Sequence, residues 1–169
     1  MEKGVYVIDN TKGDEPFVLL HDGFDFSREF SFECKMRKTK GDNDSVWYGL
    51  VWGYQTDGDF CDFLVGADGT YSLNIKDAAK YNEIVKWAQS PALERNDEFN
   101  VLRIERRAAT LNFMGRKMKN LDQFDYHFFI NGQLVQTYDN WPTVYGTLLA
   151  FRMSDGVKVE VDYIKVTVP

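Results

Sequence analysis

The chain has 169 residues, of which 44% are hydrophobic and 27% charged, so its composition predicts a folded globular protein with one domain spanning residues 1–169. Its net charge of -6 argues against nucleic acid binding, because nucleic-acid-binding domains usually carry a basic face. No apolar run approaches the roughly 20 residues of a membrane-spanning helix, and the N-terminus lacks the apolar stretch of a signal peptide. If the chain is complete, this favours a cytoplasmic location; membership of a larger multidomain protein is the alternative.

Polar and apolar residues alternate along most of the chain, and this period of two predicts strands. In residues 29–37, for example, Phe30, Phe32, Cys34 and Met36 fall on one face and charged or small residues on the other, as in a half-buried strand. Strands are predicted in chain order at residues 5–9, 17–21, 29–37, 47–54, 60–66, 70–75, 82–88, 99–106, 126–138, 147–153 and 157–168, with a hairpin inside 126–138.

The connections between these strands support the same class of fold. Asn131-Gly132 predicts a type I′ hairpin turn, and the apolar parity changes near Asp162, which predicts a β-bulge. The segment 76–83 is the only helix-like candidate. About a dozen short strands with frequent turns predict an all-β protein, an antiparallel β-sandwich.

The two cysteines, Cys34 and Cys61, lie within apolar strand patterns. Their surroundings favour buried free thiols over a disulfide. The chain has two histidines, His21 and His127, which leaves little material for a zinc site or a Cys/His nucleophile pair.

Six segments in a fixed order carry a resemblance to a known fold. They are YGLVWG, FCDFLVGADGTYSL, VKWAQSPAL, FNVLRIER, FFINGQLV and the terminal VEVDYIKVTV. This succession resembles the concanavalin A-like jelly roll, and more narrowly the laminin-G-like or glucanase-like domains of bacterial proteins. The resemblance covers residues 5–168 and implies a jelly-roll sandwich, a fold that hosts lectins, hydrolases and protein-binding modules.

One segment departs from the pattern of the resembling domains. Residues 113–126 intervene before the Ile-Asn-Gly hairpin and are interpreted as an inserted loop or an extra hairpin, where new binding surfaces often lie. A passive surface loop is the competing interpretation. The same region carries a basic cluster, residues 103–120. Solvated strand edges explain this cluster more simply than an anion site does.

Aromatic rings beside hydrogen-bonding side chains predict a saccharide site, because sugars present apolar C–H faces and hydroxyl groups. Alternate residues of a strand share one face. In residues 47–54 the face with Trp52 and Tyr54 is a candidate ligand surface. In residues 60–66 the face with Asp62 is the better candidate for an open surface. The predicted carbohydrate-binding residues are Trp52, Tyr54, Asp62, Tyr71, Asn74, Trp87 and Trp141. For any single tryptophan, packing in the core is the competing interpretation.

Calcium is the one cofactor for which the sequence offers candidate ligands. Asp57 and Asp59 are weak calcium candidates, because lectin and laminin-G domains can bind calcium through aspartates at the rim of the sandwich. The order of acidic residues does not match an EF-hand loop, and aspartates beside glycine are also ordinary turn residues.

No complete catalytic motif is found in the sequence. Glycoside hydrolysis needs two carboxylates on one surface. Glu160 and Asp162 have a suitable spacing, but Lys165 stands where a third carboxylate would be. The sequence therefore predicts a non-catalytic binding module with a glycan ligand. A protein-interaction or scaffold domain is the alternative, and a glycoside hydrolase is a weaker one.

Overall fold

The structure, a computed structural model, describes residues 4–13, 17–21, 23–42, 45–55, 58–77, 80–95, 97–114, 116–139, 141 and 146–168. Within these residues the chain forms twelve strands and no helix. The strands are β1 Tyr6–Asn10, β2 Phe17–His21, β3 Phe30–Lys40, β4 Trp47–Tyr54, β5 Phe60–Gly66, β6 Thr70–Asp77, β7 Lys80–Gln89, β8 Asn100–Phe113, β9 Arg116–Ile130, β10 Gln133–Asp139, β11 Leu148–Met153 and β12 Val157–Thr167.

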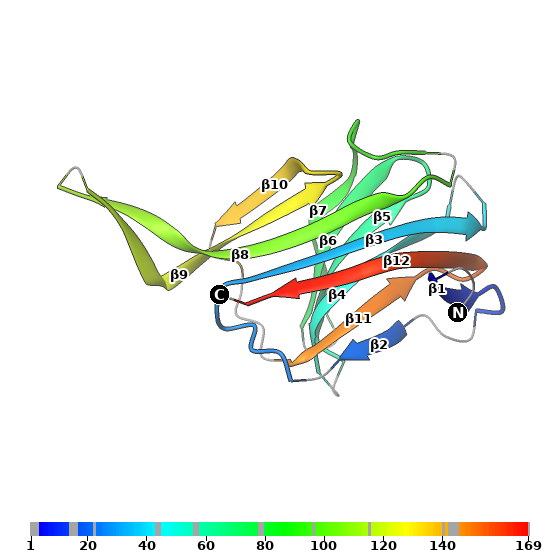
Figure 1. The fold of residues 1–169 in the computed structure, drawn as a ribbon, viewed down its shortest axis with the longest axis horizontal. Coiled ribbons are helices and arrows are strands. Elements are labelled where there is room, and N and C mark those ends of the chain that lie inside the picture. The colour runs from blue at the N-terminus through cyan, green and yellow to red at the C-terminus, as the bar shows by residue number, and fades with distance from the viewer. Residues whose placement is uncertain are drawn as a thin grey trace.

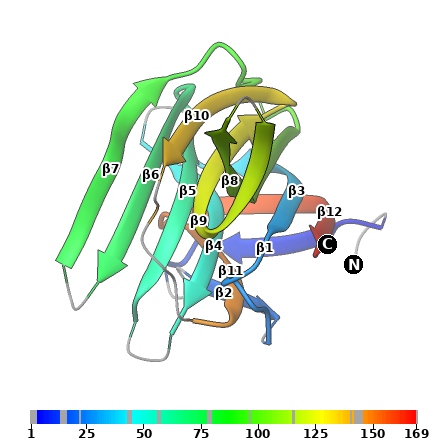
Figure 2. The ribbon, with the colours of Figure 1, turned by 90° about the vertical axis from the view of Figure 1, so that its left-hand side faces the viewer.

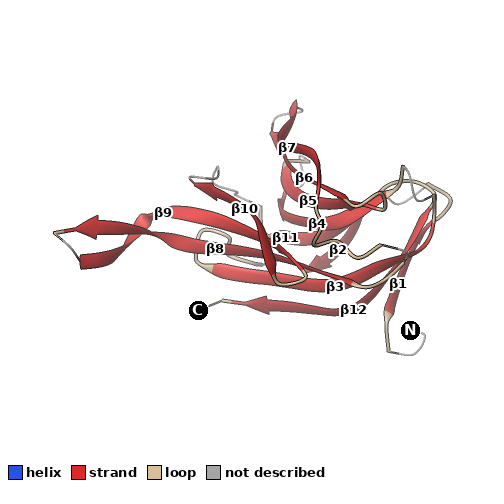
Figure 3. Ribbon diagram, turned by 90° about the horizontal axis from the view of Figure 1, so that it is seen from above, coloured by secondary structure: helices blue, strands red, loops and turns tan. Residues whose placement is uncertain are grey.

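The strands form two six-stranded antiparallel sheets. One, called here the β3 sheet, has the order β1-β12-β3-β8-β9-β10; the other, the β5 sheet, has the order β2-β11-β4-β5-β6-β7. Figures 2 and 3 show the two sheets as separate layers of a sandwich. The predicted all-β antiparallel sandwich is therefore confirmed.

The core lies between the layers and is rich in aromatic side chains. Strand β3 alternates buried and half-buried residues along its length, as its period of two predicts. Phe32, Cys34 and Met36 are fully buried, and they belong to one buried cluster with Trp52 of the β5 sheet and Phe128 of β9. Burial of such rings supplies much of the driving force for folding, about 25 cal/mol per Å² of apolar surface.

Two local predictions hold. Asn131 and Gly132 have φ values of 50° and 79°, the left-handed conformation that a type I′ turn requires, and they join β9 to β10. The pairing of β12 with β3 shifts between Val161 and Tyr163, so the bulge predicted near Asp162 is confirmed.

The helix-like segment 76–83 is not helical in its described residues, so that prediction is wrong. Its start belongs to β6 and its end to β7, which pair through Lys76 with Tyr81 and Asp77 with Lys80. A short segment at the end of a sheet gains more from hydrogen bonds with its neighbour than from an isolated helical turn, since short helices are marginal.

Segment 113–126 belongs to β8, β9 and the turn between them. The two strands continue past the neighbouring strands as a hairpin that projects from the sandwich (Figures 1 and 3). Their pairing shifts between Ala108 and Ala109, where the projecting part begins. We call residues 109–120 the arm; residue 115 within it lies outside the described residues.

Both cysteines are buried free thiols, as predicted. Burial raises the pKa of both thiols, that of Cys61 to about 12, and Cys61 Sγ accepts a hydrogen bond from Trp141 Nε1 at 3.2 Å. We expect no reaction with dithionitrobenzoate at pH 8 in the folded protein and two thiols per chain in guanidinium, because only the accessible thiolate is reactive. Fast labelling of the folded protein would contradict this placement.

Candidate functional site

The outer face of the β5 sheet carries the candidate site. Cross-strand partners lie on the same face of a sheet, and Asp62 lies opposite both Val51 of β4 and Asn74 of β6. The row of β4 that contains Trp47 and Val51 therefore shares the face of Asp62. The other row, which contains Trp52, points into the core.

Buried polar side chains form the floor of this face. Asp62 is completely buried, and its carboxylate accepts hydrogen bonds from Asn74 Nδ2 (2.6 Å), Tyr81 Oη (3.1 Å) and Arg152 Nη1 (2.5 Å). Asn74 Nδ2 also donates to Ser72 Oγ at 3.0 Å. Burial raises the pKa of Asp62, and the Arg152 guanidinium opposes that shift.

Asn74 keeps one polar atom without a hydrogen-bond partner in the described part of the chain. Its side-chain oxygen Oδ1 is buried and accepts no hydrogen bond there. The orientation of the amide follows from its neighbour, because a carboxylate only accepts and Nδ2 must therefore face Asp62. The floor thus contains a fixed acceptor with spare capacity.

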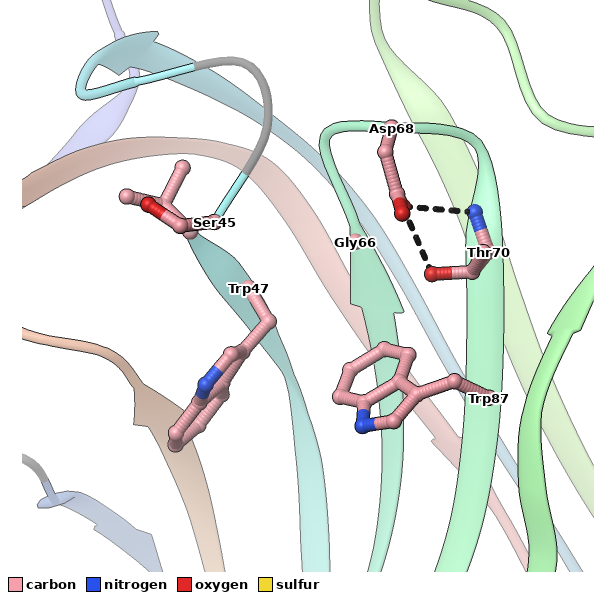
Figure 4. Close-up of a pocket in the computed structure, with 7 residues that line it drawn as sticks. Ser45, Trp47, Gly66, Asp68, Thr70 and Trp87 are labelled. Carbon is pink, nitrogen blue, oxygen red and sulfur yellow. Dashed lines mark hydrogen bonds between the residues drawn. The ribbon is translucent and has the colours of Figure 1, made fainter.

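Two tryptophans stand at the sides of this floor. Trp47 comes from β4 and Trp87 from β7, and in Figure 4 the Trp87 ring extends across β6 toward Trp47. They line two adjoining hollows of about 190 and 220 Å³. The first is completed by Ser45, Val46, Gly66, Asp68 and Thr70, and the second by Leu64, Ser72, Asn74, Tyr81, Glu83 and Arg152. We call the two hollows together the groove.

The turn between β5 and β6 closes one end of the groove. Asp68 Oδ1 accepts hydrogen bonds from the backbone and the hydroxyl of Thr70, at 3.0 and 2.6 Å (Figure 4). A Cβ atom at Gly66 would lie 2.5 Å from the Asp68 carboxylate and 2.6 Å from the Thr70 hydroxyl, so a larger residue would displace these two side chains. The sequence ADG after β5 therefore shapes the groove as well as the turn.

Three predicted site residues do not lie on this face. Trp52, Tyr71 and Trp141 are buried in the core between the sheets, so the prediction that they line an open surface is wrong. Trp52 packs against Tyr126 and Trp141, with ring centroids 6.1 and 5.7 Å apart. Large aromatic side chains fit on the strand faces that point between the two sheets. Burying them there stabilises the fold more than leaving them exposed to solvent would.

Tyr54 does not share the row of Trp52, contrary to the sequence interpretation. Gly53 has a positive φ of 64°, and the pairing of β4 with β11 shifts between Tyr54 and Trp52. This irregularity turns Tyr54 outward, where it stacks on Phe60 at 6.1 Å. Of the predicted residues, Asp62, Asn74 and Trp87 are brought together at the groove.

The calcium candidates are only partly described. Asp57 lies outside the described residues. The backbone oxygen of Asp59 accepts a hydrogen bond from Gln55 in the turn between β4 and β5. In the described ranges no group of three or more His, Cys, Asp or Glu side chains converges as metal ligands would, so calcium binding stays a prediction.

The carboxylates considered for hydrolysis lie on the β3 sheet, away from the groove. Glu160 pairs with Arg37 and Asp162 with Lys35, each at 2.7 Å. The bulge between Val161 and Tyr163 also breaks the period of two on which their shared face depended.

Sequence reasoning missed Trp47, Tyr81 and Arg152. The strand pairing is the signal for Trp47, because its row lies opposite the row of β5 that contains Asp62, which the sequence predicts to face solvent. Arg152 is the only charged residue in β11, which is a signal in itself, since an isolated charge in a central strand usually has a partner. Tyr81 lay in the segment taken as helix-like.

Comparison with known proteins places the fold. No protein-family model matches the chain, and no curated protein matches its sequence. Among solved structures, it is similar to sheep galectin-11 in complex with glycerol, with TM-score 0.58, 13% identity and coverage of 99% of this chain and 100% of that one. The chain has the concanavalin A-like jelly-roll fold.

Two bacterial structures show the same architecture. One is the carbohydrate-binding module CBM66 from Bacillus subtilis, with TM-score 0.59, 10% identity and coverage of 89% of this chain and 94% of that one. The other is the Bacillus licheniformis β-glucanase, with TM-score 0.57, 10% identity and coverage of 84% and 67%. At these identities the likeness establishes the fold, and the narrower laminin-G-like resemblance stays a prediction. No helix in the described ranges is long and apolar enough to cross a membrane.

Proposed function

We propose that the chain is a non-catalytic carbohydrate-binding module that holds a saccharide in the groove between Trp47 and Trp87. The observation that carries this proposal is the arrangement of two indole rings beside a floor of hydrogen-bonding side chains. Aromatic faces suit the C–H faces of a pyranose ring, and polar side chains select its hydroxyls.

The floor favours a polyhydroxyl ligand over an apolar one. Ser72, Asn74 and Glu83 line the same hollow, and the buried Asn74 Oδ1 has no hydrogen-bond partner among the described residues. Asp62 is occupied by its own partners, so its role is to orient Asn74 and Arg152. An apolar ligand would leave these groups without partners, which costs binding free energy.

The groove has room for more than one sugar ring. The two hollows share Trp47 and Trp87 and lie at different heights along β5 and β6, one near Thr70 and the other near Asn74. The proposed ligand is therefore a di- or oligosaccharide. The similar structures include two proteins whose names describe a galectin and a carbohydrate-binding module, which supports the proposal.

Replacing Trp47 or Trp87 by alanine should weaken saccharide binding by about 10-fold or more, the usual cost of removing an aromatic anchor. The measurement is a glycan array followed by calorimetric titration of the best ligand. Tyr163→Ala is the matched control, because Tyr163 is an exposed aromatic residue of the β3 sheet and should leave affinity unchanged.

The same experiments separate the alternatives. If no saccharide binds across plant, algal and animal glycans, the proposal fails and a protein-interaction or scaffold domain remains. If Trp47→Ala and Trp87→Ala both bind like the parent, the ligand site is elsewhere. Release of reducing ends from a bound polysaccharide would instead indicate a hydrolase. Repeating the titration with a chelator tests the predicted calcium dependence.

A further inference from the structure

The arm is the feature that the groove does not explain. Residues 109–120 extend past the other strands of the β3 sheet (Figures 1 and 3). Five residue pairs, from Ala109–Asn120 to Phe113–Arg116, hold it together. At about 3.3 Å per residue the arm is roughly 16 Å long, so its end stands well clear of the sandwich.

The charge of this region is opposite to that of the rest of the chain. The arm contains three basic residues and no Asp or Glu, and Arg106 and Arg107 precede it. The net charge of -6 for the whole chain therefore leaves -9 on the residues outside the arm. Because the arm is longer than the Debye length of about 8 Å at physiological ionic strength, its end presents positive charge independently of the acidic sandwich.

The base of the arm is neutralised and anchored, and its end is not. Near the base, Lys119 pairs with Glu29 at 2.8 Å, and the Arg106 guanidinium lies 3.5 Å from the centre of the Phe124 ring. At the end, Arg116 is exposed and forms no ion pair with a described residue. The base thus holds the hairpin in place while the end remains available.

Apolar side chains accompany the positive charge at the end. Met114, in the turn, is 88% exposed and Met118 is 54% exposed. The stability of the fold does not explain these two side chains, because an exposed methionine buries no apolar surface when the chain folds. A polyanion such as nucleic acid would use the cations and leave the methionines in water, whereas a bilayer takes both groups.

We propose that the arm docks the chain on an anionic lipid bilayer. Met114 enters the interface between headgroups and acyl chains, and Arg116 pairs with an anionic headgroup. The order of residues suits this, because the most exposed apolar residue lies in the turn and Arg116 lies at the first residue pair behind it. Apolar burial together with headgroup attraction is the usual basis of peripheral membrane binding.

The test is sedimentation of the whole chain with vesicles free of glycolipid, so that the result is independent of saccharide binding. We expect binding to vesicles of phosphatidylcholine with about 30% phosphatidylserine, and none to pure phosphatidylcholine. Arg116→Glu should weaken binding about 10-fold, and Met114→Ser about 5-fold, from the usual contributions of a headgroup-paired cation and a buried apolar side chain. Salt should weaken binding as well.

Matched variants control for net charge and for general loss of apolar surface. Lys12→Glu changes an exposed basic residue, and Leu134→Ser changes an exposed apolar residue on β10; both should bind like the parent. The proposal is overturned if anionic vesicles do not bind the chain, or if Lys12→Glu weakens binding as much as Arg116→Glu. It is also overturned if heparin or RNA binds the arm while vesicles do not.

Discussion

Replacing Arg152 by methionine should destabilise the protein by about 3–5 kcal/mol, the usual cost of removing one partner of a buried ion pair. Asp62 is completely buried and Arg152 is its only charged partner among the described residues, at 2.5 Å. Without the guanidinium, the carboxylate at the centre of the β5 sheet keeps only its bonds from Asn74 and Tyr81. Urea unfolding followed by circular dichroism measures the change in the free energy of unfolding.

Two further variants test the cause. Adding Asp62→Asn to Arg152→Met removes the unpaired charge and should recover a large part of the loss. Lys35→Met breaks a pair with Asp162 that is about one third exposed on both sides, so it should cost no more than about 1 kcal/mol. A loss of equal size for Lys35→Met and Arg152→Met would contradict the assigned burial.

The loss in Arg152→Met should also depend on pH in a defined direction. Burial raises the pKa of Asp62 in the folded protein, and removal of Arg152 raises it further. Between the unfolded pKa of about 3.9 and this higher value, the folded state binds more protons than the unfolded state, so stability rises as the pH falls. The deficit should therefore be largest at neutral pH and shrink on acidification. A deficit that grows toward low pH would be inconsistent with an unpaired carboxylate.

The second large effect is expected for Trp52→Ala, which should destabilise the protein by about 3–5 kcal/mol. Trp52 is fully buried and contacts the rings of Tyr126, Phe128 and Trp141. Its removal leaves a cavity that surrounding strands cannot close, because both sheets are held by their hydrogen bonds. Urea unfolding followed by far-ultraviolet circular dichroism avoids the change in tryptophan fluorescence.

Trp87→Ala is the matched control for this variant. Trp87 is 41% exposed on the outer face of the β5 sheet, so its loss should change stability by less than about 1 kcal/mol. Only Trp87→Ala should weaken saccharide binding, since Trp52→Ala leaves the groove intact while the protein is folded. Equal destabilisation by both variants would show that the two faces of the sheet have been assigned wrongly.

The fold could be predicted from the sequence because its determinants are local. The period of two in residues 29–37, the Asn131-Gly132 turn and the parity change near Asp162 each depend on neighbours in the chain, and each is found in the structure. The helix predicted for segment 76–83 does not form in the described residues, because its alanine, lysine and glutamate residues favour a helix only locally while pairing of β6 with β7 decides the outcome.

The composition and period of the sequence by themselves determined an antiparallel sandwich with two buried thiols, because alternation and turn chemistry act over a few residues. Only the tertiary structure decided which row of each strand faces solvent. The positive φ of Gly53 and the pairing of Val51 with Asp62 place Trp52 in the core and leave Trp47 outside. Residues as distant in sequence as Asp62 and Arg152 meet only when β4, β5 and β11 pair, since which strands become neighbours depends on the whole sheet.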